Sequence, residues 1–137
     1  MKIVDRFLLS LALRSVVTHI RENIQYKAEP LGKNVWQTPP ETWEIGSGDC
    51  EDMALVLREE ILDRGLCTTD EISILILSRL SDKEKHALLQ IEKKDINGVY
   101  YVDTVDGVQT ELHQYALLHT VKPLMVALLS QYGTEEG

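Results

Sequence analysis

The sequence predicts an α+β fold in which N-terminal helices pack on a small antiparallel β-sheet. Two observations support this prediction. In the first half of the chain, apolar residues recur at the three- and four-residue spacing that is typical of helices. In the second half, short runs rich in β-branched residues are separated by turn residues, as in antiparallel strands. The expected order is helix, long loop, helix, at least three antiparallel strands and a final helix.

The first half is expected to contain two helices joined by a long connection. Residues 3 to about 25 form the first helix, with an apolar face made of Val4, Phe7, Leu8, Leu11, Val16, Ile20 and Ile24. From residue 27 to 47 the periodicity disappears and prolines and glycines become frequent, which predicts a loop. The second helix begins at or beside Cys50, with Asp49 as its N-cap, and it stops at Gly65.

The second half is expected to contain strands at residues 72–78, 86–92 and 99–105. The first run is β-branched and almost wholly apolar, as in a central strand. The polar turn SDKEK follows it, and the pair Asn97-Gly98, which is favoured in tight hairpins, precedes the third strand. The C-terminal stretch, residues 112–132, is expected to be mixed irregular and helical structure, with a helix that starts at Pro123.

Composition fits a single globular domain that spans residues 1–137. The chain is 44% hydrophobic and 26% charged, and at this size folding buries roughly two-thirds of the unfolded surface, enough for a core without disulfides. Against 22 Asp and Glu there are 14 Lys and Arg, and the net charge is −8. The basic residues are scattered singly among acidic ones, which argues against nucleic acid and a membrane surface as partners.

The apolar stretch FLLSLAL at residues 7–13 lies near the N-terminus, where a targeting signal would be found. It is too short to span a bilayer, so membrane insertion is not expected. It is also followed by no small-residue cleavage site of the kind that ends a signal peptide. We therefore expect a cytoplasmic protein from the chain as written, or a periplasmic one if a leader has been removed.

Cys50 is the candidate nucleophile, because a helix N-terminus stabilises a thiolate. Acyl transfer also needs an imidazole to move the proton and a third group to orient that imidazole. His86 opens one predicted strand and Asp103 lies near the end of the next, so a hairpin can bring them side by side. Asp106 is an alternative to Asp103, although its turn-like position favours a role in shaping the loop.

Each of these residues also has an ordinary structural explanation. A lone cysteine at a helix start is more often a small buried hydrophobe than a catalytic group. Cys67, in the turn before the first strand, is expected to be structural, and the spacing of the two cysteines fits neither a disulfide framework nor a zinc site. The conjunction of cysteine, histidine and aspartate is what favours catalysis.

Two runs of the sequence match a known pattern: WQTPPET at residues 36–42 and GSGDCEDMA at residues 46–54. Together they resemble the bacterial transglutaminase-like cysteine peptidases, the family that includes the LapG-type adhesin proteases. That family has a Trp-x-Thr-Pro-x-Glu segment, a glycine-rich stretch, and Asp-Cys-Glu-Asp at the start of a helix. His86 and Asp103 also fall where the family's histidine and aspartate do. The resemblance covers residues from about 20 to 103.

The resemblance implies a papain-like, transglutaminase-type core with a Cys-His-Asp triad. Cys50 would be the nucleophile, His86 the general acid and base, and Asp103 the orienting carboxylate, with hydrolysis through a thioester. The oxyanion of the tetrahedral intermediate needs two donors. The Cys50 backbone N–H is one, and the indole N–H of Trp36 is the candidate for the other; the alternative is that Trp36 packs the loop.

The acidic residues beside Cys50 would raise its pKa, which a bound cation would counteract. Hard oxygen ligands suit Ca²⁺, and the resemblance implies calcium dependence through the acids that flank the cysteine. Here these are Asp49 and Glu51, with Asp52 as a weaker third metal ligand. The alternative needs no metal: Asp49 caps the helix, and Glu51 and Asp52 complement its dipole.

The first hypothesis for function is therefore a cysteine endopeptidase that acts on a protein substrate, of bacterial or phage origin. In the family the substrate is a large surface adhesin, and a membrane receptor sequesters the protease as a regulatory partner. A second hypothesis keeps the triad but transfers the acyl group to an amine, or deamidates, as transglutaminases do. A third is a non-catalytic binding or assembly module of the same fold.

Overall fold

The computed structural model describes residues 2–28 and 35–135. The N-terminal half contains α1 (Lys2–Asn23), β1 (Gln25–Tyr26), β2 (Val35–Trp36), α2 (Pro39–Ile45), β3 (Ser47–Gly48) and α3 (Cys50–Asp63). The C-terminal half contains the 3-10 turn Thr69–Glu71, β4 (Ile72–Arg79), β5 (Lys85–Lys93), the 3-10 turn Lys94–Ile96, β6 (Gly98–Asp103), β7 (Gly107–Gln109), β8 (Tyr115–Thr120), α4 (Pro123–Tyr132) and β9 (Thr134–Glu135). The predicted α+β class is confirmed.

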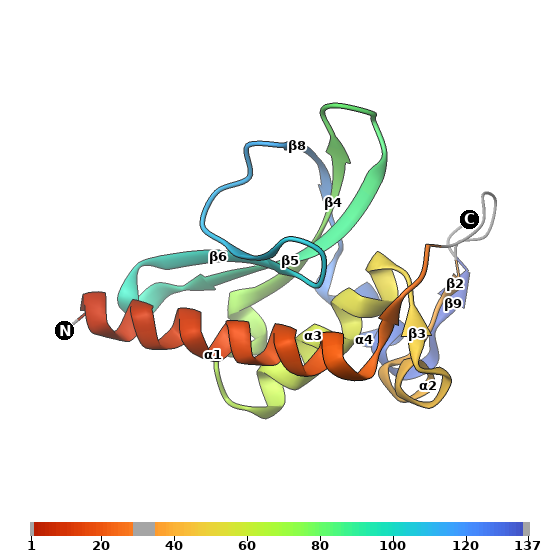
Figure 1. Cartoon of the computed structure of the whole chain (residues 1–137), viewed down its shortest axis with the longest axis horizontal. Helices are drawn as coiled ribbons and strands as arrows, with labels where there is room; N and C mark the ends of the chain where they lie inside the picture. The colour runs from red at the N-terminus through yellow and green to blue at the C-terminus, as the bar shows by residue number, and fades with distance from the viewer. Residues whose placement is uncertain (1, 29–34, 136–137) are drawn as a thin grey trace.

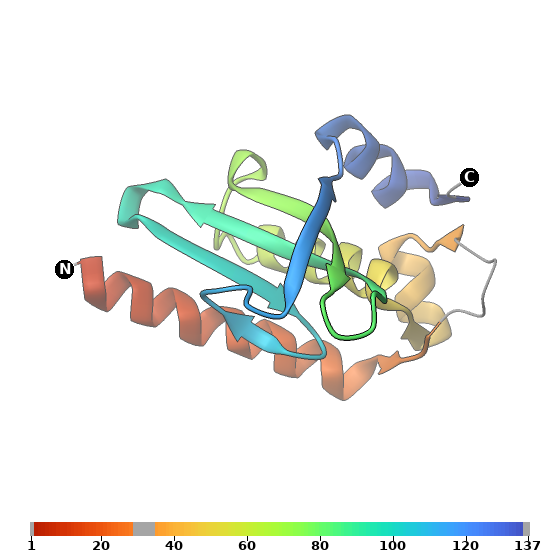
Figure 2. The same cartoon turned by 90° about the horizontal axis from the view of Figure 1, so that it is seen from above.

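The main sheet is antiparallel, with the strand order β7-β6-β5-β4-β8. Helices α1 and α3 lie on the same side of it, and α2 and α4 lie near the C-terminal end of the molecule (Figure 1). Helix α1 contacts β6 and β7, whereas α3 contacts β5 and β6. The view from above shows α1 running along the whole length of the β5–β6 hairpin (Figure 2). Two short pairs, β1 with β3 and β2 with β9, join the remaining segments.

The core lies between the two helices and the sheet. Helix α1 contributes Leu13, Val16 and Ile20, and α3 is buried over most of its length from Met53 to Leu57. Strand β4 is buried on both faces, as its apolar run predicted, because a smaller cluster covers the far side. That cluster consists of Leu75, Leu77 and Leu88, with Tyr101, Leu112 and Tyr115 packed against it. The chain between β6 and β8 therefore folds over the sheet face opposite the helices.

The predicted first two helices and the strands at 72–78 and 86–92 are confirmed, with bounds shifted by one or two residues. The third strand ends at Asp103, two residues earlier than predicted. Its hairpin loop is four residues long, 94–97, because Lys93 pairs with Gly98. The predicted helix at Pro123 is also present.

Two predictions about irregular structure were wrong. The loop expected over 27–47 contains α2, which Thr38 begins by accepting a hydrogen bond from the Glu41 backbone while the Glu41 carboxylate accepts one from the Thr38 backbone. The signal for this helix, Thr38 three residues before Glu41 with prolines between them, was present in the sequence. Residues 29–34 of that loop lie outside the described residues.

The second error concerns the stretch 112–132, which contains the edge strand β8 as well as the predicted helix. Strand β8 reads YALLHT and has no alternating pattern, so pairing with β4 decides its conformation. In the described part of the chain, no helix has both the length and the apolar composition needed to cross a bilayer.

Candidate active site

Cys50 is the first residue of α3, and a reciprocal cap fixes this end of the helix. The Asp49 carboxylate accepts a hydrogen bond from the Asp52 backbone N–H at 3.0 Å, and the Asp52 carboxylate accepts one from the Asp49 N–H at 3.1 Å. Gly48 is required beside this cap, because a Cβ atom there would lie 2.7 Å from the Asp52 Cβ. The prediction of Asp49 as the N-cap is confirmed. The cap, made by residues within three positions of each other, therefore holds Cys50 at the positive end of the helix.

Asp52 also fastens the preceding segment to the helix. Its two carboxylate oxygens accept hydrogen bonds from the Gln37 backbone N–H and the Gln37 side-chain amide, each at 2.8 Å. The Asp52 side chain is completely buried. With the bond from Asp49, the Asp52 carboxylate accepts hydrogen bonds from three N–H groups. Asp52, the third residue of α3, therefore has a structural role, and its side chain points into the protein interior.

Trp36 is buried in β2, next to the residue that Asp52 anchors. Its exposed fraction is 2%, and it belongs to the main core. Its backbone carbonyl packs against Gly133, where a Cβ atom would lie 2.5 Å from the oxygen. Packing of the loop by Trp36 is thus a structural fact, while donation from its indole to an oxyanion stays a prediction.

His86 and Asp103 form a buried pair across the β5–β6 hairpin. His86 Nε2 lies 3.2 Å from Asp103 Oδ2, and each residue is 5% exposed. Because a carboxylate only accepts, this bond assigns a ring proton to Nε2, and in the neutral ring Nδ1 is then the nitrogen with a free lone pair. The other Asp103 oxygen accepts hydrogen bonds from the N–H groups of Val105 (2.7 Å) and Asp106 (2.6 Å). The carboxylate is therefore held on both sides, as an orienting group requires.

The Cys50 thiol lies near β5, the strand that carries His86. The backbone N–H of Ala87, which directly follows His86 in the strand, is close enough to lower the pKa of this thiol. Strand β5 is thus the element that joins the two halves of the site, since it contacts α3 on one side and β6 on the other. The structure brings His86 and Asp103 together, and it places Cys50 near Ala87, the residue that follows His86 in β5.

The surroundings of Cys50 favour the protonated thiol. The pKa of Cys50 is raised to about 12, mainly by burial and in part by the charges of Asp49 and Glu51, while the Ala87 and Glu51 N–H groups oppose the shift. The expected repulsion from the two flanking acids is confirmed, but burial outweighs it. At neutral pH the sulfur consequently needs an adjacent base or a cation to become a thiolate.

The second cysteine has a different environment. Cys67 lies in the main core, and burial is the largest cause that raises its pKa, to about 11. Both cysteines are free thiols. The structural role expected for Cys67 agrees with this position, and it makes Cys67 an internal reference for the reactivity of Cys50.

The predicted metal ligands Asp49, Glu51 and Asp52 do not converge as one ligand set within the described residues. Asp52 is directed inward by the cap, while Asp49 and Glu51 remain close enough to act electrostatically on the thiol. The physical reason is helical geometry, since residues one apart at a helix start point in different directions.

A different group does converge in the described part of the chain. Ligand atoms of His86, Asp103 and Asp106 all lie within 4.8 Å of one another. Two of these atoms already share the hydrogen bond between His86 and Asp103. A metal ion at this point would have to break that bond, so we interpret the group as a hydrogen-bonded cluster.

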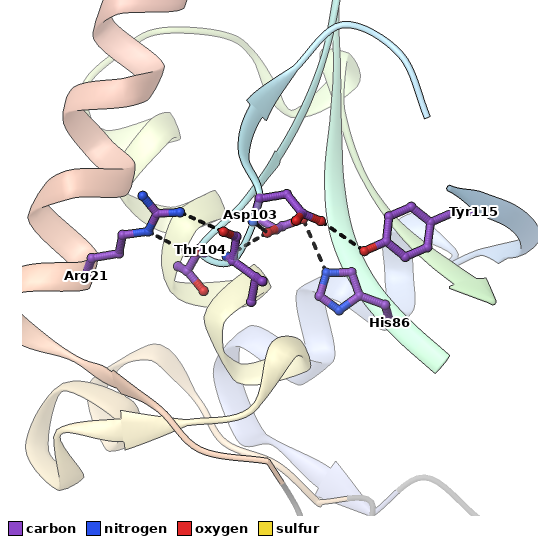
Figure 3. Close-up of polar contacts among 7 residues, drawn as sticks. Arg21, His86, Asp103, Thr104 and Tyr115 are labelled. Atoms are coloured by element: carbon purple, nitrogen blue, oxygen red, sulfur yellow. Dashed lines mark hydrogen bonds and ion pairs between the residues drawn. The ribbon is translucent and has the colours of Figure 1, made fainter. Parts of the chain in front are cut away.

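Sequence reasoning missed two residues that support this cluster, and Figure 3 shows both. The Tyr115 ring, at the start of β8, stacks on His86 with 5.5 Å between ring centroids and 16° between planes. Arg21, from α1, donates hydrogen bonds to the carbonyls of Thr104 and Val105, directly after Asp103. Nothing in the sequence pointed to either, because Arg21 lies far from the site along the chain and Tyr115 belongs to a strand that the sequence did not predict.

Known proteins resemble this chain in structure but not in sequence. No protein-family model matches the chain, and no curated protein matches its sequence. Among solved structures, calcium-bound LapG of Legionella pneumophila matches with a TM-score of 0.70 at 18% identity, covering 82% of this chain and 64% of LapG. EGTA-treated LapG of the same organism matches with a TM-score of 0.72 at 18% identity, covering 83% and 63%.

A further structure of L. pneumophila LapG gives a TM-score of 0.68 at 17% identity, over 83% of this chain and 65% of that one. The chain thus spans less than two thirds of the length of the LapG structures it matches. The family resemblance drawn from residues 36–54 is confirmed at the level of the fold. This chain has the papain-like, transglutaminase-type α+β fold of LapG.

Proposed function

We propose that this protein is a cysteine peptidase that cleaves a peptide bond in a protein substrate through Cys50, His86 and Asp103. The observation that carries the proposal is the buried hydrogen bond between His86 and Asp103, and it is supported by the position of the Cys50 thiol near Ala87, the next residue of β5. A histidine and a carboxylate that are both 5% exposed are costly to bury unless they act as a pair.

The proposed reaction begins with proton transfer from the Cys50 sulfur to His86 Nδ1. The thiolate attacks the substrate carbonyl carbon, and the negative charge moves to the carbonyl oxygen, which the Cys50 backbone N–H stabilises. His86 then returns the proton to the leaving amine as the C–N bond breaks, which leaves a thioester on Cys50. Water attacks the thioester with His86 again as the base, and the acid product and the free thiol are released. Asp103 stabilises the imidazolium in both halves.

We propose calcium as a cofactor held by Asp49 and Glu51. These are hard oxygen ligands, and their charges already act on the Cys50 sulfur, so the donor set fits a divalent cation near the thiol. LapG of L. pneumophila has been solved in calcium-bound and EGTA-treated forms. When bound, the ion would supply positive charge that lowers the pKa of Cys50. Asp52 is left out of the proposed set, because its oxygens accept N–H groups of the protein.

Alkylation by iodoacetamide, mapped by mass spectrometry, tests the nucleophile. In the presence of calcium we expect Cys50 to react at neutral pH much faster than Cys67, and to lose this advantage in His86→Ala. His119→Ala is the matched control, since His119 is an exposed histidine on β8. If Cys50 reacts no faster than Cys67 under every condition, the proposal is overturned.

Product analysis on a peptide library then tests the reaction. Hydrolysis adds one water across the cleaved bond, whereas transfer to an added amine gives a conjugate of different mass. Peptide cleavage that disappears in Cys50→Ser supports the peptidase. Conjugation or deamidation without cleavage would replace it with the acyl-transfer alternative.

A further inference from the structure

Two carboxylates compete for one imidazole in this structure. Oxygen atoms of Asp103 and Asp106 both lie within 4.8 Å of a His86 ring nitrogen and of each other. Only one can accept the Nε2 proton, and it is Asp103 that does so, at 3.2 Å. Asp106 is exposed and follows Asp103 by three residues, and its carboxylate is close enough to compete for the same proton. Another residue must therefore keep Asp106 from replacing Asp103 as the acceptor of this proton.

Tyr115 is the residue that holds Asp106 away. Its hydroxyl donates a hydrogen bond of 2.9 Å to Asp106 Oδ2. Burial raises the pKa of Tyr115, and the bond to Asp106 raises it as well, so the phenol stays protonated and remains a donor. The Arg79 side chain, at the end of β4, lies near the Tyr115 oxygen, since each of the two groups shifts the pKa of the other.

The ring of the same tyrosine fixes the plane of the imidazole. It stacks on His86 at 5.5 Å with a tilt of only 16°, and it belongs to the small cluster that covers the outer face of β4 and β5. An aromatic face also favours the positively charged imidazolium that forms when the base takes up a proton. Tyr115 therefore affects His86 in two ways: its ring stacks on the imidazole, and its hydroxyl forms a hydrogen bond with the competing carboxylate of Asp106.

We propose that Tyr115 is a positioning residue that selects Asp103 over Asp106 as the partner of His86. This inference deepens the proposed function and rests on it for its catalytic meaning. The ring sets the orientation of the imidazole, and the hydroxyl occupies the competing carboxylate. Tyr115→Phe keeps the ring and releases Asp106, whereas Asp106→Asn removes the competing charge. The second change should therefore correct the defect that Tyr115→Phe causes.

The test measures two quantities in wild type, Tyr115→Phe, Asp106→Asn, the double variant and Tyr115→Leu. The first is the position of the ring proton of His86, read from its ¹⁵N chemical shifts without any substrate. The second is the rate of Cys50 alkylation. Tyr101→Phe is the matched control, because Tyr101 packs against the same small cluster. Circular dichroism confirms that each variant is folded.

We expect Tyr115→Phe to shift the Nε2 signal of His86 and to slow Cys50 alkylation roughly threefold to tenfold, the size of one ordinary hydrogen bond. The double variant should restore both to near the wild-type values, and Tyr115→Leu should slow alkylation more than Tyr115→Phe does. Unchanged ¹⁵N shifts in Tyr115→Phe, or no restoration in the double variant, would overturn the inference.

The two readouts separate this inference from the proposed function. If the His86 shifts respond as expected while Cys50 is unreactive even in wild type, the peptidase proposal fails and the positioning role stands. If Cys50 is reactive and equally so in all variants, with unchanged His86 shifts, the peptidase proposal stands and the positioning role fails.

Discussion

The two sides of the candidate active site are held in place by different means. On the Cys50 side, the helix start is fixed by Asp49 and Asp52, which lie within three residues of each other, and by Gln37. On the His86 side, the side chains come from β5, the end of β6, the start of β8 and α1. The first side is mainly a local structure and the second depends on the tertiary fold. Substitutions on the His86 side should therefore mainly lower activity, whereas substitutions on the Cys50 side should mainly lower stability.

The largest expected effect is on the His86 side. Asp103→Asn should lower kcat/KM for peptide cleavage by roughly 10³- to 10⁴-fold, because an amide can donate to Nε2 and so favour the wrong ring tautomer. Steady-state kinetics on a cleaved peptide measure this. Asp95→Asn, at an exposed aspartate in the hairpin loop, is the control and should change kcat/KM little. A loss below tenfold would mean that Asp103 does not orient His86.

On the Cys50 side, the strongest effect should be on stability. Asp52→Ala leaves three N–H groups without their acceptor in a completely buried place, and it should lower the free energy of unfolding by about 2–4 kcal/mol. Urea denaturation measures the change. Asp63→Ala, at the exposed end of the same helix, is the control. A change below about 0.5 kcal/mol, the usual size at a surface site, would show that the cap is not what holds Cys50.

A smaller effect should follow from the contact between α1 and the Asp103 turn. Arg21→Ala removes the donors to the Thr104 and Val105 carbonyls, and the looser turn should lower kcat/KM roughly threefold to tenfold with an unchanged fold. Arg14→Ala is the control, since Arg14 is an exposed arginine on the same helix. If the two variants behave alike, the turn is held without help from α1.

The smallest expected effect is that of Glu51 on the rate of Cys50 alkylation, and the direction of the change should depend on calcium. Its negative charge is one of the causes that raise the pKa of Cys50. In calcium-free protein, Glu51→Gln should therefore lower that pKa and speed alkylation at pH 8 by roughly twofold to fivefold. In the presence of calcium the same variant should react more slowly than wild type, because one proposed ligand is lost.

The reversal of sign is measured by alkylation with calcium or with EGTA. Glu59→Gln, in the middle of the same helix, is the control and should show no calcium dependence beyond that of wild type. If Glu51→Gln alkylates faster than wild type both with calcium and with EGTA, the electrostatic effect of Glu51 on Cys50 stands, but Glu51 is not a ligand of the proposed calcium site.

Much of the Cys50 side could be predicted from the sequence. Asp49 as the N-cap, Cys50 as the first helical residue and the repulsion from the flanking acids all depend on neighbours a few positions away. The α2 helix could also have been found from Thr38 and Glu41, since its capping signal is local. The hairpin that joins His86 to Asp103 followed from two strands and a short turn.

The rest was decided by tertiary structure. Strand β8 has weak strand character of its own and gains its conformation from pairing with β4, which in turn brings Tyr115 onto His86. Burial, the largest cause of the raised Cys50 pKa, and the contact from Arg21 likewise arise only when distant segments pack together. Capping and periodicity act over three or four residues and can be read along the chain. The shielding of a charge and the stacking of two rings depend on which distant surfaces meet, and the folded chain alone specifies that.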